Sequence, residues 1–546
     1  MAKYSIGIDF GTLSGRAILV DVSDGSEIAE ATLEYKHGVM DEYLCDSDIK
    51  LPSDYALQHP LDYIDVIEYC IPKIIKDTGV HKSDIIGIGV DFTSCTVIPT
   101  YGDGSPLCLS QEFNNVPDAY VKLWKDHSSL PYANKLTELA KTKGYDFIQR
   151  YGGAISSEWL IPKIWHILDN SPDVYKSAEY FIEAADWIVW QLTGIQARSS
   201  CTCGYKAMWH HSEGYPQSSF FEMLDPKFSD LLSNKLNAPI LPLGTKVGRL
   251  TEYWADKLGL STDTAVAVGN IDGHATVPAL KVTKPGQLLM ILGTSACFMT
   301  LDQRELEVRE IAGYVKDGMI PGFYGYEAGQ ACMGDHFAWF IKNMMPYEYK
   351  LEAQRLGKSD IVHMFDLAAD LNPGENGLIA LDWWNGNRAL PCKEGLCGTI
   401  IGMNLSTKPE HIFRALVEAT AFGARKIIDN YRKYGLEINV IHAAGGIAEK
   451  NPFVMQLYAD VLDMDIKISG SPQAAALGAA IFGAVAGGAY DSVTDASDKM
   501  GKLKDIVYKP DSTHRDVYDA LYKEYCRLYD HFGRDSDTMS KIKLYK

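Results

Sequence analysis

The sequence lacks the features that would tie a protein to nucleic acid or to a membrane. Lys and Arg total 52 against 71 Asp and Glu, which gives a formal net charge of −19 at pH 7. General nucleic-acid binding needs a basic face that displaces counterions from phosphate, so this acidic excess argues against it. The most apolar long run, residues 474–489, is broken by four glycines and is short for a membrane span. We expect this run to form a small-residue helix packed closely on a sheet.

Paired cysteines are also missing. The 11 cysteines form an odd set without the Cys-x-x-Cys spacing that zinc sites favour. Cys201 and Cys203 are the only close pair, and their spacing fits buried free thiols better than a metal site. We therefore expect neither disulfides nor a structural metal. Residues 1–5 lead straight into a strand and leave no room for a signal or transit peptide, so we expect a cytoplasmic protein.

Two Gly-Thr turns are the most informative features that are present. Gly11 and Thr12 follow the strand-like run 4–8, and Gly293 and Thr294 follow a similar apolar run. A residue without a side chain lets the backbone turn tightly and aim N–H groups and a hydroxyl at an anion. Two such turns could hold one polyphosphate from opposite sides.

The spacing of the turns suggests a duplicated architecture. They lie about half of the 546-residue chain apart, and a chain of this length should exceed one hydrophobic core and split into domains. Pro285 and Gly286 break the chain just before the second turn, so we place the boundary there, with domains at 1–280 and 281–546. Strand and helix patterns interleave in both halves, which predicts two α/β domains.

Local patterns place several elements. Asn451 before Pro452 is a standard helix start, and Thr407 with Glu410 is predicted to form a capping box. Periodicity predicts helices over 61–77 and 452–462, and strands over 85–92, 265–268 and 440–444.

One stretch of the C-terminal half resembles a known family signature. Residues 398–403, with His411, Ile412 and 415–418 after them, are similar to the C-terminal signature of the FGGY carbohydrate kinases. The resemblance extends from the first strand to about Tyr490. It implies two ribonuclease-H-like domains of the actin and hexokinase type, flanking a catalytic cleft. The N-terminal domain would bind the sugar and carry the first phosphate motif, and the C-terminal domain would bind the nucleotide.

Three glycine turns resemble motifs of the wider group of ATPases that contains actin, hexokinase and the heat-shock chaperones. The first phosphate motif matches Asp9, Phe10, Gly11 and Thr12 with Arg16, the second matches Gly293 and Thr294, and the adenosine motif matches Gly445 and Gly446. This resemblance implies ATP and Mg²⁺ as cofactors. Leu13 departs from relatives that carry a hydroxyl at its position, so one phosphate hydrogen bond is expected to be missing.

Five stretches further resemble the ribulokinase branch of that family. They are residues 91–96, 202–210, 269–274, 326–330 and 381–388. The resemblance implies ATP-dependent phosphorylation of L-ribulose at its C5 hydroxyl, giving L-ribulose 5-phosphate in L-arabinose catabolism. The sugar is then expected to contact Ser94, Lys206, Asp272 and Glu327. Buried polar groups of this kind reject an analogue that leaves them unpaired.

Phosphoryl transfer to an alcohol needs a base, a metal and donors that neutralise charge. Asp272 is the predicted base, because it follows the strand 265–268 and would project from the strand end into the cleft. Asp9 is predicted to hold Mg²⁺ through water, and Arg16 to stabilise the transferring group. On local grounds alone, Asp272 could instead be a turn residue, Arg16 a surface arginine and Lys206 a solvated lysine.

Two other functions remain open from the sequence. The nearer alternative is a kinase for another ketopentose or polyol, such as D-ribulose, L-xylulose or ribitol, because stereochemistry depends on geometry that a sequence does not display. The more distant one is a non-catalytic nucleotide-binding protein of the same fold. A homodimer is plausible for the family, although no segment demonstrates it.

Overall fold

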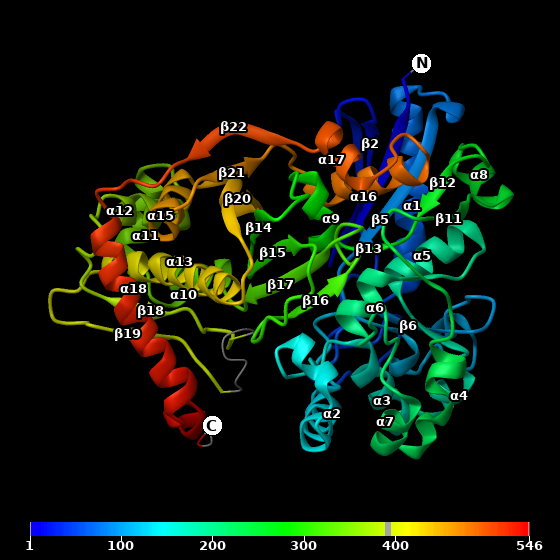
Figure 1. The fold of residues 1–546 in the computed structure, drawn as a ribbon, viewed down its shortest axis with the longest axis horizontal. Helices are drawn as coiled ribbons and strands as arrows, with labels where there is room; N and C mark the ends of the chain where they lie inside the picture. The colour runs from blue at the N-terminus through cyan, green and yellow to red at the C-terminus, as the bar shows by residue number, and fades with distance from the viewer. Residues whose placement is uncertain (1, 388–394, 544, 546) are drawn as a thin grey trace.

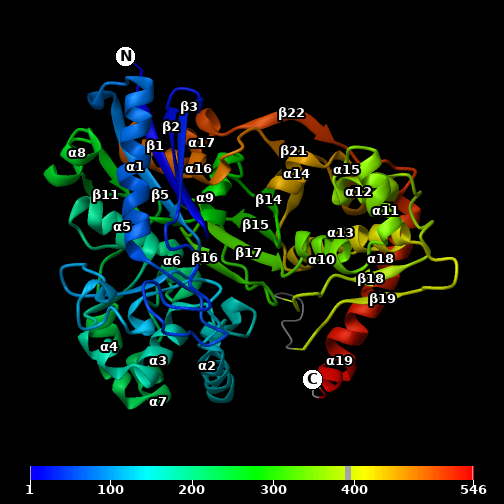
Figure 2. The same cartoon turned by 180° about the vertical axis from the view of Figure 1, so that it is seen from behind.

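The computed structural model describes residues 2–387, 395–543 and 545. Arg388, the last residue of the fifth ribulokinase-like stretch, lies outside them. Two large sheets lie side by side, each with helices packed against it (Figures 1 and 2). A smaller lobe of strands and helices sits at one end of the first sheet (Figure 1).

The first sheet combines an antiparallel hairpin unit with parallel strands. Its strand order is β11-β12-β5-β1-β2-β3, and β13 pairs with β5. β2 is antiparallel to both β1 and β3, whereas β5 runs parallel to both β1 and β12. The bounds are β1 (Tyr4–Phe10), β2 (Ser14–Asp21), β3 (Glu27–Glu34), β5 (Ile85–Phe92), β11 (Lys246–Arg249), β12 (Ala265–Ala267) and β13 (Asn270–Ile271).

The second sheet repeats this plan in the order β16-β17-β15-β14-β20-β21-β22. β14, β15 and β17 are antiparallel, and β14, β20 and β21 run parallel. β14 therefore corresponds to β1, and β20 to β5, which confirms the predicted pair of α/β domains. The bounds are β14 (Gly286–Leu292), β15 (Ala296–Asp302), β16 (Gly313–Lys316), β17 (Tyr324–Gln330), β20 (Ile438–Ala444), β21 (Ile466–Ser469) and β22 (Leu503–Tyr508).

The apolar run predicted as a helix, residues 474–489, forms α16 (Ala474–Ala486), a helix of small residues. It comes from the second half of the sequence but packs on β1 and β5 of the first sheet. A Cβ on Gly7 would collide with the carbonyl oxygen of Ala476, so only glycine permits this approach. The helix joins the two halves, and the boundary at residue 280 stays a prediction.

Helices cover both sheets and frame the smaller lobe. The lobe has a four-stranded sheet in the order β4-β7-β6-β8, covered by α2, α3, α4 and α7 (Figure 1). Its elements are β4 (Leu57–Gln58), β6 (Val97–Thr100), β7 (Val121–Lys122), β8 (Tyr180–Glu183), α2 (Leu130–Lys143), α3 (Leu160–Asn170), α4 (Pro172–Ser177) and α7 (Ser218–Leu224). The other helices used below are α1 (Pro60–Thr78), α6 (Ser200–Lys206), α9 (Asp272–Ala279), α10 (Gly334–Asn343), α12 (Asp360–Ala369), α13 (Pro409–Lys433), α14 (Gly446–Lys450) and α15 (Pro452–Leu462).

One predicted helix start is wrong. α13 begins at Pro409 with Lys408 as its N-cap, and the Lys408 N–H donates to His411 Nδ1 over 3.3 Å. The Thr407 hydroxyl is instead used one turn earlier, where it accepts from the Asn404 N–H at 2.9 Å. The carboxylate of Glu410 accepts from a tyrosine hydroxyl rather than closing a capping box.

The ten cysteines that the structure describes are all free. Among residues 2–387, 395–543 and 545, no three His, Cys, Asp or Glu side chains come together as a metal cage. None of the helices within those ranges is both long and apolar enough to cross a membrane.

Candidate active site

The first phosphate turn is a tight hairpin between β1 and β2. The Gly11 N–H donates to the Ser14 carbonyl over 2.9 Å, which closes the turn. Thr12 is held on two sides, because its carbonyl accepts from Gln58 Nε2 at 2.8 Å and its hydroxyl oxygen accepts from Trp124 Nε1 at 3.2 Å. An indole nitrogen can only donate, so the Thr12 hydroxyl keeps its own proton for another acceptor, such as a phosphate oxygen.

The second phosphate turn lies at the matching end of β14. The Gly293 N–H donates to the Ser295 carbonyl over 2.9 Å, and the Gly293 carbonyl accepts from the Gly334 N–H at 3.0 Å. The Thr294 carbonyl accepts from the Met333 N–H at 2.7 Å. These bonds tie the turn to the start of α10 and leave the Thr294 side chain out of the backbone network.

The Gly445-Gly446 motif stands beside this second turn. Parallel pairing sets Ile291 opposite Ala444, so β14 and β20 end at the same edge. Gly445 has a φ of 97°, and a Cβ there would collide with the carbonyl oxygen of Leu292. Gly446 has no atom within 4 Å of its Cβ position, so it presents bare backbone to open space. The structure thus brings the second phosphate and adenosine motifs together.

An apolar cavity of about 430 Å³ opens next to these motifs. Its lining includes Gly334, whose N–H donates to the Gly293 carbonyl of the second turn, and Ile447, the residue after Gly446. Most of the remaining wall comes from α10 and α12, and its residues are Phe337, Ala338, Ile341, Lys342, Lys350, Ile361 and Phe365. Flat apolar walls beside phosphate-binding backbone suit a purine base. The sequence patterns did not identify this wall, because helical apolar spacing is also what core packing produces.

Three carboxylates meet near the first turn. Strand register sets Asp9 opposite Asp91, and Asp91 opposite Asn270, which begins β13 two residues before Asp272. Arg16 Nε lies 3.3 Å from Asp9 Oδ2, and the Arg16 Nη1 donates to Gln473 on the α16 side at 3.0 Å. Arg16 is thus engaged with Asp9 and Gln473, not free on an outer surface.

Asp91 is the site residue that sequence reasoning missed. Its side chain is fully buried, and neither carboxylate oxygen has a hydrogen-bond partner among the described residues. Burial, together with the charges of Asp9 and Asp272, raises the pKa of Asp91 well above its ordinary value. Burial also raises the pKa of Asp9, although Arg16 opposes that change. The signal was available, since Asp91 lies near the end of a buried strand just as Asp9 does.

Asp272 occupies the first position of α9. The prediction that it projects from the end of the strand 265–268 needs correction, because β12 stops at Ala267 and the short β13 comes between. Its Oδ1 accepts from the Gly273 N–H over 2.6 Å. Burial and the nearby charge of Asp9 raise the pKa of Asp272 to about 7. A carboxylate poised near neutrality is suited to accept a proton.

Lys206 and Glu327 form a buried ion pair that faces the same region. Lys206 Nζ lies 3.6 Å from Glu327 Oε2, although α6 and β17 are far apart in the sequence. The positive charge of Lys206 also lowers the pKa of Asp272, which places the three groups within electrostatic reach of one another. Lys206 is only 9% exposed, so the interpretation as a solvated lysine is wrong.

The charges of this pair stabilise each other. Burial would lower the pKa of Lys206, but Glu327 outweighs it and raises that pKa above its ordinary value. Burial would raise the pKa of Glu327, but Lys206 and His274 hold it below its ordinary value. Ser94 lies on the loop after β5, where its hydroxyl is 3.6 Å from the Cys95 thiol. The positive charge of Lys206 lowers the pKa of that thiol against the effect of burial, so Lys206 lies within electrostatic reach of Cys95, the residue that follows Ser94.

Family models match nearly the whole chain. The N-terminal domain of the FGGY family of carbohydrate kinases matches residues 4–278, and the C-terminal domain of that family matches residues 288–487. The chain belongs to the FGGY family of carbohydrate kinases. It is therefore a carbohydrate kinase, and the resemblance inferred from its motifs is confirmed.

Relatives and solved structures agree with this assignment. A ribulokinase from Halalkalibacterium halodurans is 49% identical over 549 residues, covering 100% of this chain and 98% of that protein. A ribulokinase from Bacillus licheniformis is 51% identical over 538 residues, covering 98% of each chain. A xylulose kinase from Lactobacillus acidophilus has a TM-score of 0.79 at 19% identity, covering 97% of this chain and 99% of that one. The last comparison shows the two-domain FGGY fold.

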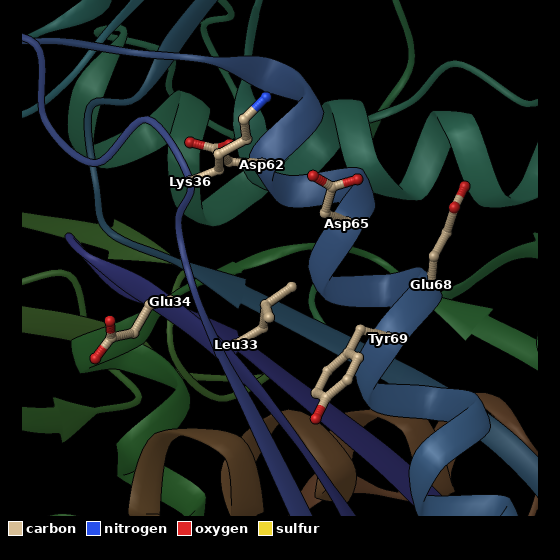
Figure 3. A pocket seen from close by; sticks show the side chains of 7 residues that line it. All are labelled: Leu33, Glu34, Lys36, Asp62, Asp65, Glu68 and Tyr69. Atoms are coloured by element: carbon tan, nitrogen blue, oxygen red, sulfur yellow. The ribbon is translucent and has the colours of Figure 1, made fainter.

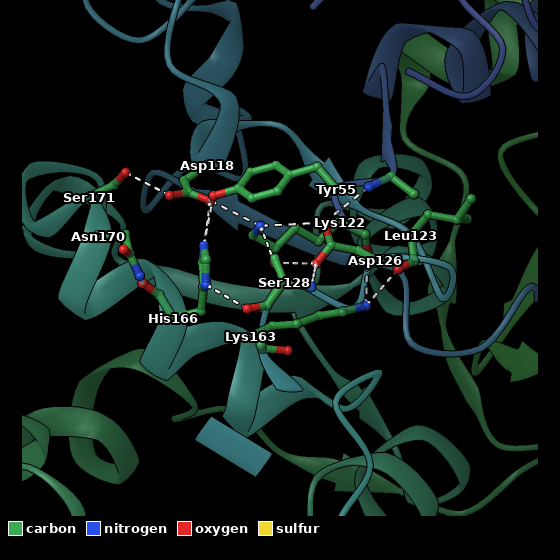
Figure 4. A network of polar contacts seen from close by, with 12 residues as sticks. Tyr55, Asp118, Lys122, Leu123, Asp126, Ser128, Lys163, His166, Asn170 and Ser171 are labelled. Carbon is green, nitrogen blue, oxygen red and sulfur yellow. Dashed lines mark hydrogen bonds and ion pairs between the residues drawn. The ribbon is translucent and has the colours of Figure 1, made fainter. Parts of the chain in front are cut away.

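A buried lysine of this FGGY kinase connects the loop after Ser94 with the segment that contacts Thr12. Lys163 Nζ donates to the carbonyls of Cys95 at 2.5 Å and Leu123 at 2.8 Å. Cys95 has a φ of 61°, an uncommon value for a residue with a side chain, and it follows Ser94 directly. Leu123 precedes Trp124, which contacts Thr12. Figure 4 shows Lys163 beside the other members of the network, Tyr55, Asp118, Lys122, Asp126, Ser128, His166 and Ser171.

A second hollow of this kinase lies outside the cleft. It has a volume of about 390 Å³ and opens between β3 and α1 (Figure 3). Acidic side chains dominate its lining, which consists of Leu33, Glu34, Lys36, Asp62, Asp65, Glu68 and Tyr69. A phosphate group would be repelled there.

Proposed function

We propose that the protein transfers the γ-phosphoryl group of ATP to the C5 hydroxyl of L-ribulose, giving L-ribulose 5-phosphate in L-arabinose breakdown. The observation that carries the proposal is the position of Asp272, which lies within electrostatic reach of both Asp9 at the first phosphate turn and the Lys206–Glu327 pair. The ribulokinase names of relatives at 49% and 51% identity over nearly full length support the choice of sugar.

Asp272 acts as the base in this proposal. With a pKa raised to about 7, it is partly ionised at neutral pH and takes the proton of the attacking hydroxyl. The hydrogen bond from the Gly273 N–H fixes one carboxylate oxygen and leaves the other for the substrate. Arg16, held against Asp9, supplies a permanent positive charge toward the moving phosphoryl group.

The residues near the first turn fit a magnesium ion. Mg²⁺ takes oxygen ligands, keeps several waters and usually uses only one or two carboxylates, so the lack of a three-residue cage within the described ranges is expected. Asp9 would hold it through water, and the unpartnered oxygens of Asp91 lie on the neighbouring strand. Bound there, Mg²⁺ would neutralise charge on the phosphates.

The remaining contacts divide between the two ligands. Ser94, Lys206 and Glu327 would hold the sugar hydroxyls and carbonyl, since charged hydrogen bonds orient a polar ligand strongly. The phosphates would contact Thr12 and Thr294 with the backbone of the two turns, and the adenosine would lie along Gly445 and Gly446 beside the apolar cavity. Closure of the two domains would exclude water and suppress wasteful hydrolysis of ATP.

One assay tests the substrate and the position of transfer together. The purified protein is given ATP and Mg²⁺ with L-ribulose, D-ribulose, L-xylulose or ribitol, and ADP release is followed. We expect the highest kcat/KM with L-ribulose, and the phosphate at C5 by ³¹P and ¹³C NMR of the product. A preference for another sugar would replace the proposed substrate, and a lack of sugar-dependent ADP release would indicate a non-catalytic protein.

Two general properties complete the proposal. We place the protein in the cytoplasm, where ATP and a reducing environment suit its free cysteines. The homodimer that the family resemblance predicts is tested by sedimentation equilibrium of the full chain.

A further inference from the structure

A histidine lies next to Glu327 of the proposed sugar site, and a cysteine contacts that histidine. His274 lies in α9, two residues after Asp272, and its side chain is 1% exposed. Its Nε2 is 3.3 Å from Glu327 Oε2, and its Nδ1 is 3.0 Å from the Cys201 sulfur. Cys201 comes from α6, so these three residues connect two helices with β17.

The chemistry of the three groups fixes the direction of their hydrogen bonds. An ionised carboxylate only accepts, so the ring nitrogen facing Glu327 must carry a hydrogen. The opposite nitrogen of a neutral imidazole then accepts, and the Cys201 thiol supplies the donor. Burial lowers the pKa of His274, which keeps the ring neutral near pH 7. Cys201 therefore donates to His274, and the N–H of His274 faces Glu327 at 3.3 Å, although the two atoms are not aligned as a hydrogen bond in this structure.

The same three residue types could also suggest a cysteine nucleophile activated by a histidine. That role requires an accessible thiolate. The Cys201 side chain is fully buried, and burial raises the pKa of its thiol well above the ordinary value. Cys201 is thus a hydrogen-bond donor within the protein.

Lys206 cannot orient Glu327 by itself. A lysine ammonium is a point charge on a flexible stem, and here it stands 3.6 Å from the carboxylate. The His274 ring is rigidly held, because its centroid lies 4.3 Å from that of the Tyr205 ring and the Tyr205 hydroxyl donates to the Gly325 carbonyl at 2.6 Å. Gly325 belongs to the same strand as Glu327, so the contacts of Tyr205 tie the imidazole ring to the strand that carries the carboxylate.

We propose that His274 is a positioning residue for the sugar, which orients the Glu327 carboxylate toward a substrate hydroxyl while Cys201 fixes the imidazole tautomer. This inference rests on the proposed function. It assigns roles to two residues that never touch the sugar, and it explains why α9 carries a histidine so close to the proposed base.

Substitutions at His274 separate positioning from packing. In His274→Gln the side-chain amide can still donate near the former Nε2, whereas His274→Leu fills the space without a donor. We expect His274→Leu to raise the KM for L-ribulose roughly tenfold or more, as loss of a donor that faces a charged group implies. The KM for ATP should stay within about twofold, because the change leaves the phosphate turns intact, and His274→Gln should recover most of the sugar KM. Equal losses in both variants, following their melting temperatures, would show a purely structural role and overturn the proposal.

The tautomer provides a test that needs no turnover. In protein labelled with ¹⁵N-histidine, the signals of His274, assigned by their loss in His274→Gln, should show hydrogen on Nε2 and a bare Nδ1. Cys201→Ser keeps a donor and should preserve this tautomer, whereas Cys201→Ala should shift the ring toward a mixture and raise the sugar KM. Cys70→Ala, which empties a buried position of α1, is the matched control and should change neither.

A wild-type ring with its hydrogen on Nδ1 would overturn the inference even if L-ribulose is phosphorylated. If instead no pentulose is phosphorylated while Nε2 carries the hydrogen, the proposed function fails and the claim that His274 serves the sugar falls with it. The two failures are therefore distinguishable by NMR and by the ADP-release assay.

Discussion

The two glycine turns close in a similar way and differ in charge. In each, a glycine N–H closes onto a serine carbonyl over 2.9 Å at the end of a central strand. In the first hairpin the second cross-strand pair from the turn is Asp9 and Arg16, and in the second hairpin the corresponding pair is Ile291 and Cys297. The neighbouring parallel strand repeats the contrast, because Asp91 stands beside Asp9 whereas an alanine stands beside Ile291.

This contrast shows how a duplicated fold divides one reaction. Backbone N–H groups suffice to bind phosphates, so the glycine turn can serve this purpose in both halves. A buried charge is costly unless it is paired or used, so an acidic cluster is expected only on the side where the phosphoryl group moves. The first half is thus assigned to the chemistry and the second half to holding the nucleotide. The following predictions test that division.

The largest effect is expected at Asp272. Asp272→Asn removes the proposed base but keeps the size of the side chain, so kcat should fall about 10²- to 10⁴-fold. Binding of ADP, measured by calorimetry, should change little because the nucleotide is held by the other half. A variant that still phosphorylates L-ribulose at near the original rate would end the assignment of the base.

The pH profile examines the same residue without a mutation. The base must be ionised, and its pKa is raised to about 7, so kcat/KM should climb as the pH rises from 5 and level off above about 8. If kcat/KM falls only below pH 5, the rate depends on a carboxylate of ordinary pKa. The measurement is the ADP-release rate at low L-ribulose across buffers of constant ionic strength.

Arg16 and Cys297 offer a matched pair at equivalent places in the two hairpins. Arg16→Ala removes a charged donor proposed to face the moving phosphoryl group, so kcat should fall about 10²-fold. Cys297→Ala should leave kcat within about twofold, because no charge is lost on the nucleotide side. Steady-state kinetics at saturating ATP measures both. Comparable losses in the two variants would contradict the division between the halves.

Much of the fold follows from local sequence, because its signals act over a few residues. The glycine turns, the strand predicted over 85–92 and the helix predicted over 452–462 all form where expected. The predicted cap at Thr407 is wrong because the Thr407 hydroxyl accepts a hydrogen bond in the preceding turn. A capping pattern in the sequence does not reveal this competition.

The site was less accessible from sequence because its members meet through strand register and helix packing. Asp91 gains its importance from the residue opposite it on β1. Lys206 and Glu327 are brought together by a helix and a strand of different halves, so they were found only through the family resemblance. His274 was overlooked because its partners, Cys201 and Glu327, are distant in the chain.

A smaller effect is expected at the adenosine motif, where two adjacent glycines differ in their surroundings. Gly445→Ala forces a side chain into a φ of 97° and against the Leu292 carbonyl, so the free energy of unfolding should fall by about 1–3 kcal/mol. The KM for ATP should rise, because Leu292 leads into the second turn. Gly446→Ala meets no atom within 4 Å and should be nearly neutral for stability. Thermal denaturation and KM values for ATP compare the two, and equal losses would contradict the crowding at Gly445.

The smallest effect is expected at Leu13, where the two turns differ by one residue. The Gly11 N–H reaches Ser14, but the Gly293 N–H reaches Ser295, so Leu13 takes the position of that serine and lengthens the first turn. Its side chain is 62% exposed, and Leu13→Ser should change the free energy of unfolding by less than about 0.5 kcal/mol. An added hydroxyl should lower the KM for ATP about threefold, as one modest hydrogen bond to phosphate implies. An unchanged KM would mean that position 13 points away from the phosphates, and that the first turn binds them through Thr12 and backbone alone.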